Sequence, residues 1–178
     1  MVAHPRLYGV NAVQFKLDLT EACMSDPELD AVLNGLLEYT KVLPGNKKHP
    51  IEILVLRGHL LIERELRGLI EAKLQRPTAF DLDNMKFSTT MRLAEALYGE
   101  AVADWIWGSI KQLNTIRNSL AHHLNDDTLV PRIERVVESF KSRDPKTFKY
   151  VKNTMQEQLA YCLADLHHEL LKARHFRS

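Results

Sequence analysis

The segment that most constrains the fold is residues 51–74. When it is drawn as a helix, leucines and isoleucines fall on more than one side of it. Pro50 precedes the segment and Pro77 follows it, so its length is that of one long helix. A helix with a single apolar stripe lies at a surface, whereas a helix that is apolar on several sides needs neighbours on several sides. The sequence therefore predicts a bundle with residues 51–74 as its central helix.

Other segments carry apolar residues at helical spacing. The first expected helices are residues 29–40 after a cap at Ser25-Asp26-Pro27-Glu28, residues 88–98 ended by Gly99, and residues 100–124 with a break at Gly108. The next helix is capped by Asp126, Asp127 or Thr128 and has an apolar stripe of Ile133, Val136, Val137 and Phe140. A long last helix runs from Asp144-Pro145 through Leu170. The fold class predicted by these segments is all-α, a compact bundle of five to six helices.

The N-terminal segment follows a different pattern. Val13, Phe15, Leu17 and Leu19 alternate with mostly polar residues, which is typical of a short strand. No partner strand follows directly, so an extended arm packed on the helices is an equal alternative. We therefore divide the chain into an N-terminal arm or strand, residues 1–24, and a helical domain, residues 25–178. A chain of 178 residues can bury a sizeable core as one domain.

Composition narrows the classes of partner. The formal net charge is +1, so any binding of nucleic acid needs a local basic patch, for which the C-terminal Lys172, Arg174, His175 and Arg177 are candidates. No apolar run approaches the roughly 20 residues that span a bilayer, and residues 1–20 lack a secretory apolar core. Cys23 and Cys162 indicate neither a disulfide framework nor a metal site. We expect a cytoplasmic protein that does not insert into membranes.

Two histidine pairs invite a metal interpretation. His122-His123 and His167-His168 are each adjacent in sequence, so on a helix their side chains diverge by about 100°. Neither pair is completed by a carboxylate or histidine at ligand spacing. The sequence predicts no metal site and no cofactor.

Arg117 is the unusual residue of the helix expected at 100–124. Drawn at 100° per residue, this helix has an apolar arc formed by Ile106, Ile110, Leu113, Ile116, Leu120 and Leu124. Arg117 falls inside the arc, and a buried guanidinium requires a partner. Glu63 or Glu65 would serve if the two helices pack antiparallel. His59 shares a face with Glu63, because the two are four residues apart.

A second row on the same helix is polar. Asn114, Asn118 and His122 recur every four residues, and His122 is rotated about 140° from Arg117. Arg117 and His122 of one chain would therefore not converge on one point. Two copies related by a twofold axis could bring Arg117 of one and His122 of the other together, with Asn118 beside them.

The segment Arg117-Asn118-Ser119-Leu120-Ala121-His122 resembles the R-x4-6-H motif of HEPN domains, including the polar residue that commonly follows the arginine. The helix containing residues 56–63, with its inward-facing acidic residue, is similar to the other core helix of that family. The resemblance covers roughly residues 50–170. It implies a small helical bundle with the motif late in a core helix.

The resemblance also implies an activity. Many HEPN proteins are metal-independent endoribonucleases that act as dimers. By this resemblance His122 would be the general base or acid, Arg117 would stabilise charge on the phosphate, and Asn118 would orient either group. His59, Glu63 and Asn114 would support them. HEPN toxins that are controlled by nucleotidyltransferase antitoxins carry a tyrosine two residues after the histidine; Leu124 stands there in this chain, so this control is not supported.

Two functions remain open from the sequence. The leading hypothesis is a HEPN-type endoribonuclease of the toxin or defence kind, a homodimer that acts on single-stranded RNA. The alternative is a non-enzymatic regulator or adaptor, similar to the mannitol-operon repressor family, that acts through protein contacts. The protein partners to expect are an antitoxin for a toxin and a regulatory protein for an adaptor. In that alternative Arg117 forms a structural ion pair and His122 caps the helix C-terminus.

Overall fold

The computed structural model describes residues 50–79, 81–122, 128–148 and 154–175. This part of the chain is all-α, as predicted. Its elements are α3 (Pro50–Lys73), the short 3-10 helix η2 (Pro77–Ala79), α4 (Phe87–Tyr98), α5 (Asp104–His122), α6 (Leu129–Arg143), α7 (Pro145–Phe148) and α8 (Met155–His175). The expected N-terminal strand or arm and the expected helix at 29–40 lie outside the described residues.

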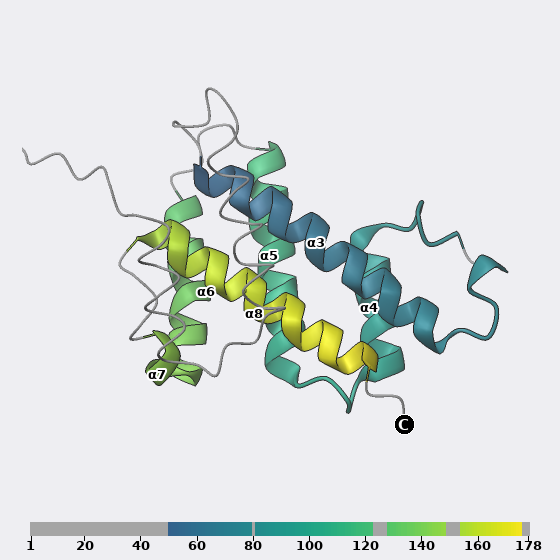
Figure 1. The fold of residues 1–178 in the computed structure, drawn as a ribbon. Coiled ribbons are helices and arrows are strands. Elements are labelled where there is room, and N and C mark those ends of the chain that lie inside the picture. Colours follow the sequence, from purple (N-terminus) through teal and green to yellow (C-terminus); the bar gives the residue numbers. More distant parts are fainter. Residues whose placement is uncertain (1–49, 80, 123–127, 149–153, 176–178) are drawn as a thin grey trace, which may run out of the picture.

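Helix α3 is the central member of the bundle, which confirms the prediction from its apolar sides. It packs against α8, α4 and α5, and Figure 1 shows α3 and α8 running alongside each other with α5 crossing behind them. Its buried side chains lie on several faces and include Leu54, Val55, Ile62, Leu66, Leu69 and Ile70. Burial on several faces is what a helix needs when its apolar residues exceed one stripe.

The remaining helices complete one core around α3. The stripe predicted for α6 is buried in full, with Ile133, Val136, Val137 and Phe140 each at most 5% exposed. Trp105 and Trp107 of α5 also pack inside the bundle: Trp107 is 2% exposed, and the Trp105 ring meets Phe140 edge to face. None of the described helices is both long and apolar enough to cross a membrane.

Helices α3 and α8 approach each other closely at Gly58. A Cβ added there would lie 2.5 Å from Cδ1 of Leu163, which is itself 1% exposed. Since carbon atoms in contact lie about 3.5–4.0 Å apart, a side chain at position 58 would collide with the buried Leu163 side chain, and that side chain or the helices would have to shift. Gly58 therefore permits the close approach of the two longest helices of the described part.

The break expected at Gly108 is absent. Helix α5 runs unbroken from Asp104 to His122. It also starts later than the predicted residue 100. A single glycine costs a helix about 1 kcal/mol relative to alanine. The burial of Ile106, Trp107 and Ile110 around it outweighs that cost.

The prediction that the last helix starts at Asp144-Pro145 was wrong. Pro145 begins only the short α7, and the long helix α8 starts at Met155. Its N-terminus is a reciprocal capping box, in which the Glu157 backbone N–H donates to Oγ1 of Thr154, while the Thr154 backbone N–H donates to the Glu157 carboxylate. The Thr-x-x-Glu sequence at 154–157 was the available signal.

The predicted cap of α6 is realised only in position. Thr128 precedes the helix, but its side chain accepts no capping hydrogen bond from the first turn, and its backbone is in the right-handed helical region. A capping side chain needs an extended backbone at this position to reach the N–H groups of the first turn. The alternatives Asp126 and Asp127 lie outside the described residues.

Candidate functional site

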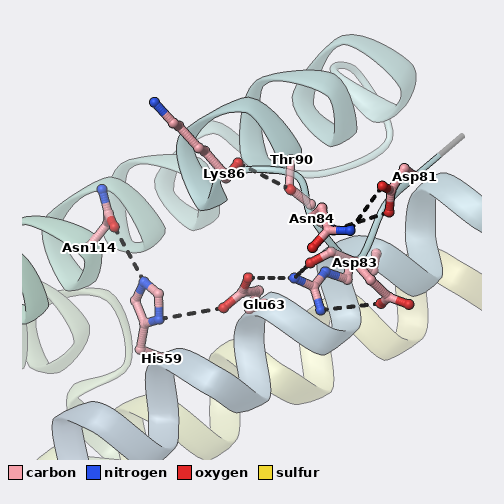
Figure 2. Close-up of polar contacts among 9 residues, drawn as sticks. His59, Glu63, Asp81, Asp83, Asn84, Lys86, Thr90 and Asn114 are labelled. Atoms are coloured by element: carbon pink, nitrogen blue, oxygen red, sulfur yellow. Dashed lines mark hydrogen bonds and ion pairs between the residues drawn. The ribbon is translucent and has the colours of Figure 1, made fainter.

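His59 of α3 lies at the point where α3 and α5 meet. Its Nε2 is 3.3 Å from Oδ1 of Asn114 on α5, and its Nδ1 is 4.0 Å from Oε2 of Glu63, one turn further along α3 (Figure 2). The spacing of four residues between His59 and Glu63 put both on one face, as predicted. The structure thus brings together the three residues expected to support the motif.

The environment of His59 favours its neutral form. Burial lowers the pKa of His59, and the positive charge of Arg117 acts in the same direction; the hydrogen bond with Asn114 and the charge of Glu63 oppose them without reversing the shift. The ring is 4% exposed and lies 4.0 Å, centroid to centroid, from the ring of Phe87. A neutral imidazole carries one N–H, and both neighbours present oxygen acceptors, so the ring can donate to only one of them at a time.

The sequence suggested that Glu63 pairs with Arg117, but in the structure Glu63 has a different partner. Its Oε1 accepts a hydrogen bond of 2.8 Å from Nη2 of Arg67, one turn along α3. The same guanidinium reaches Asp83, which lies between η2 and α4. Glu63 is therefore held by its own helix and not by α5, because the neighbour four residues along a helix is always close, whereas a residue on another helix must be in register.

Glu65, the other expected partner of Arg117, faces α8 instead. Its carboxylate lies 3.2 Å from Nε2 of His167, 2.9 Å from Nε of Arg64 and 3.8 Å from Nη1 of Arg174; the His167 approach lacks the alignment of a good hydrogen bond. Burial raises the pKa of Glu65, but the interactions with His167 and Arg64 together outweigh it, so that the pKa is lowered overall. Two residues apart on a helix, Glu63 and Glu65 necessarily point to different neighbours.

Arg117 is exposed, which corrects the expectation that it is buried on the apolar face. Its Nη1 donates a 3.2 Å hydrogen bond to Oδ1 of the exposed Asn118. Within the described part of the chain, no carboxylate lies at ion-pair distance from this guanidinium. Ile116, 2% exposed, occupies the core at this level of α5. Arg117 stands at the edge of the apolar arc, where a long side chain can carry its charge into solvent.

His122 ends α5, as the motif position late in a core helix required. Its side chain is outside the described part, so its convergence with Arg117 stays a prediction. The structure therefore places Arg117, Asn118, Asn114, His59 and Glu63 along the junction of α3 and α5. It leaves Glu65 on the opposite side of α3.

The remaining candidates for metal and anion binding occupy other places. His167 and His168 are buried in α8, and among residues 50–79, 81–122, 128–148 and 154–175 no group of three or more histidines, cysteines and carboxylates could hold a metal ion. Two cations of the C-terminal cluster lie near carboxylates: Lys172 pairs with Glu169, and Arg174 lies near Glu65.

Sequence reasoning missed two contributors to the site. Phe87 covers the His59 ring from the first turn of α4, and Arg67 locks Glu63. Arg67 could have been found, because Glu63 and Arg67 have the spacing of a helical ion pair. The contact of Phe87 with His59 could not have been found, because it depends on how the connector between α3 and α4 brings the chain back beside α3.

Comparison with family models, curated proteins and solved structures gave no match to this chain. The HEPN resemblance is thus carried by the motif and its helical context alone.

Proposed function

We propose that this chain is a metal-independent endoribonuclease of the HEPN type, of the toxin or defence kind, that acts on single-stranded RNA as a homodimer. The observation that carries the proposal is the state of Arg117. Its guanidinium is exposed, its hydrogen bond goes to the neutral Asn118, and no described carboxylate balances its charge. An exposed arginine can bind a phosphate with its planar fork of donors.

The proposed chemistry moves two protons. His122 accepts the proton of the ribose 2′-hydroxyl as this oxygen attacks the neighbouring phosphorus. The His122 imidazole, now protonated, then gives a proton to the 5′-oxygen as the bond between phosphorus and this oxygen breaks. The products are a cyclic phosphate and a free 5′-hydroxyl. Arg117 stabilises the negative charge that grows on the phosphate oxygens, and Asn118 fixes the guanidinium by the hydrogen bond between them.

His59, Asn114 and Glu63 are positioning residues in this proposal. The bond between His59 and Asn114 ties α5 to α3 one turn before the motif, and Arg67 holds the Glu63 carboxylate beside His59. The neutral state of His59 avoids a second positive charge next to Arg117. These contacts would hold the part of α5 that carries the motif in a fixed position against α3.

A homodimer is part of the proposal because Arg117 and His122 diverge by about 140° on one helix. Leu56 and Leu60 support it. They lie four residues apart on α3, flank His59, and are 43% and 58% exposed. Apolar side chains exposed beside the motif are suited to cover by a second copy, which would bring His122 of one chain near Arg117 of the other.

The same leucines favour a second candidate function. A non-enzymatic regulator or adaptor, similar to the mannitol-operon repressor family, would use Leu56 and Leu60 to bind a regulatory protein. In this case the motif would serve the interface and not a reaction.

Cleavage of single-stranded RNA in EDTA distinguishes the two functions. We expect wild type to cleave, and both Arg117→Ala and His122→Ala to lower the rate by at least about a hundredfold, the usual effect of removing a transition-state donor or a general base. Arg76→Ala is the matched control, because Arg76 is exposed and lies beyond the far end of α3. Light scattering would show whether each variant keeps the mass of the wild-type dimer.

Two results would overturn the assignment. One is an Arg117→Ala variant that cleaves like wild type. The other is a folded, dimeric wild type that cleaves no RNA, which would favour the regulator or adaptor.

A further inference from the structure

A basic groove lies between α5 and α6, on a part of the molecule that the motif does not include. It has a volume of about 530 Å³ and is lined by Lys111, Gln112, Thr115, Ile116, Arg132 and Arg135. Of these six described residues, three are cations and none is an acid. With a net charge of +1 for the whole chain, this is a local concentration of positive charge.

Among the described residues, the hydrogen bonds of the two arginines of the groove go to neutral acceptors. Nη1 of Arg132 donates a 3.1 Å hydrogen bond to Oγ of Ser119, and Nε of Arg135 donates to the carbonyl oxygen of Pro131. Both acceptors are neutral, and neither arginine forms an ion pair with another described residue. Lys111 differs, since its Nζ lies 2.8 Å from Oε1 of Glu95. The positive charge of the groove therefore rests on α6.

The shape of the groove suits a phosphate-bearing chain. Arg132 and Arg135 are three residues apart on α6, so they stand on one face and can present two forks of donors. Arg132 is half-buried and held by Ser119, which limits the side-chain entropy lost when it binds a ligand. The buried Ile116 provides an apolar floor, and Gln112 and Thr115 add polar groups.

The groove borders the motif through α5. Residues 111, 115, 118 and 122 follow one another at intervals of four, three and four, which is one stripe of an α-helix. Lys111 and Thr115 of this stripe line the groove, and Asn118 belongs to the motif. A strand that lies in the groove is thereby led along α5 toward the motif.

We propose that the groove between α5 and α6 binds the phosphates of the RNA strand on which the motif acts. The assignment of RNA rests on the proposed function, whereas the groove and its charge do not. The groove is an alternative to the C-terminal cluster, in which Lys172 and Arg174 lie near acids.

The test is the binding of a short, fluorescently labelled single-stranded RNA to the full chain in EDTA, followed by anisotropy over a range of salt concentrations. Loss of two phosphate contacts should flatten the slope of log affinity against log salt by about 1.4, since each contact contributes about 0.7 for single strands. We expect this change, with at least about tenfold weaker binding, for Arg132→Gln/Arg135→Gln. The control Arg76→Gln/Arg92→Gln removes two exposed arginines outside the groove.

Each outcome decides the proposal. If the groove variant and the control have the same affinity and slope, or if wild type binds no RNA, the proposal is overturned. If inorganic phosphate binds but RNA does not, the groove belongs to a small anion. Should Arg132→Gln disturb folding, Arg135→Gln alone carries the test, with an expected slope change of about 0.7.

The groove and the proposed activity fail separately. If RNA binds through the groove but is not cut, the endoribonuclease proposal is overturned and the groove proposal stands. If the groove variant cuts RNA as well as wild type does, the groove proposal is overturned and the endoribonuclease proposal stands.

Discussion

The two sides of α3 each carry a histidine–carboxylate pair with a buried histidine, but the surroundings of the two pairs differ. Toward α8, Glu65 and His167 are 4% and 3% exposed, and Gly58 lets the helices touch. Toward α5, the His59–Glu63 pair lies beside exposed leucines and an exposed arginine. The same pair of residue types thus serves packing on one side and borders the candidate site on the other. Which role a pair takes depends on the helix that covers it.

The largest effect is expected from Glu65→Ala. Removing one partner of a buried pair costs 3–5 kcal/mol in general, and we expect about 3 kcal/mol here because Arg64 and Arg174 reach solvent and keep their hydration. Urea unfolding would measure the loss. Glu63→Ala is the matched control on the same helix and should cost less than about 1 kcal/mol. Equal losses for the two variants would remove the distinction between the two sides.

A smaller effect is expected from Gly58→Ala. The added methyl group meets the Leu163 side chain at 2.5 Å, and overpacking of this kind costs about 2 kcal/mol. The better helix propensity of alanine offsets about 1 kcal/mol, so the expected net loss is about 1 kcal/mol. Gly68→Ala has the same gain in propensity, but its Cβ would meet only the end of the Arg174 side chain, which can move. A calorimetric melting temperature that falls for Gly68→Ala but not for Gly58→Ala would contradict this account of α3 and α8.

The smallest effect is a pH dependence that separates the two pairs. The pKa of His59 is lowered from its ordinary 6.5, so the unfolded chain binds more protons, and stability falls as the pH drops below 6.5 toward the folded pKa. The pKa of Glu65 is lowered from 4.5, so its contribution is complete above pH 4.5 and is lost only as the pH falls further. Unfolding free energies measured across this range should show that His59→Asn removes the upper decline alone. A variant that keeps both declines would show that His59 does not titrate as its burial requires.

Much of the fold could be predicted from the apolar pattern. Leucine and isoleucine on several sides identified α3 as the central helix, and the α6 stripe of Ile133, Val136, Val137 and Phe140 is buried. Errors occurred where a local signal competed with packing. Gly108 suggested a break that the core around it prevents. Asp144-Pro145 suggested the start of a long helix that begins only at Met155, after the capping box of Thr154 and Glu157.

The candidate site was predictable in its members but not in its pairings. The repeats along α3 and α5 identified His59, Glu63, Asn114 and Arg117 as members, and the structure gathers them at one junction. The partner of Arg117 was assigned wrongly, because helical spacing specifies neighbours within a helix and says nothing of the register between two helices. The arginines of the α5–α6 groove were missed for the same reason.

The sequence by itself determined the helices of this protein and the residues that share each helical face, because both follow from a repeat of 3.6 residues per turn. The tertiary structure alone decided that Arg117 reaches solvent, that Glu65 turns to His167, and that Arg132 and Arg135 meet Lys111 across a groove. These outcomes depend on how far the helices approach one another and at which angle they cross. Side-chain volumes across all the helices set those quantities together, and no single segment contains them.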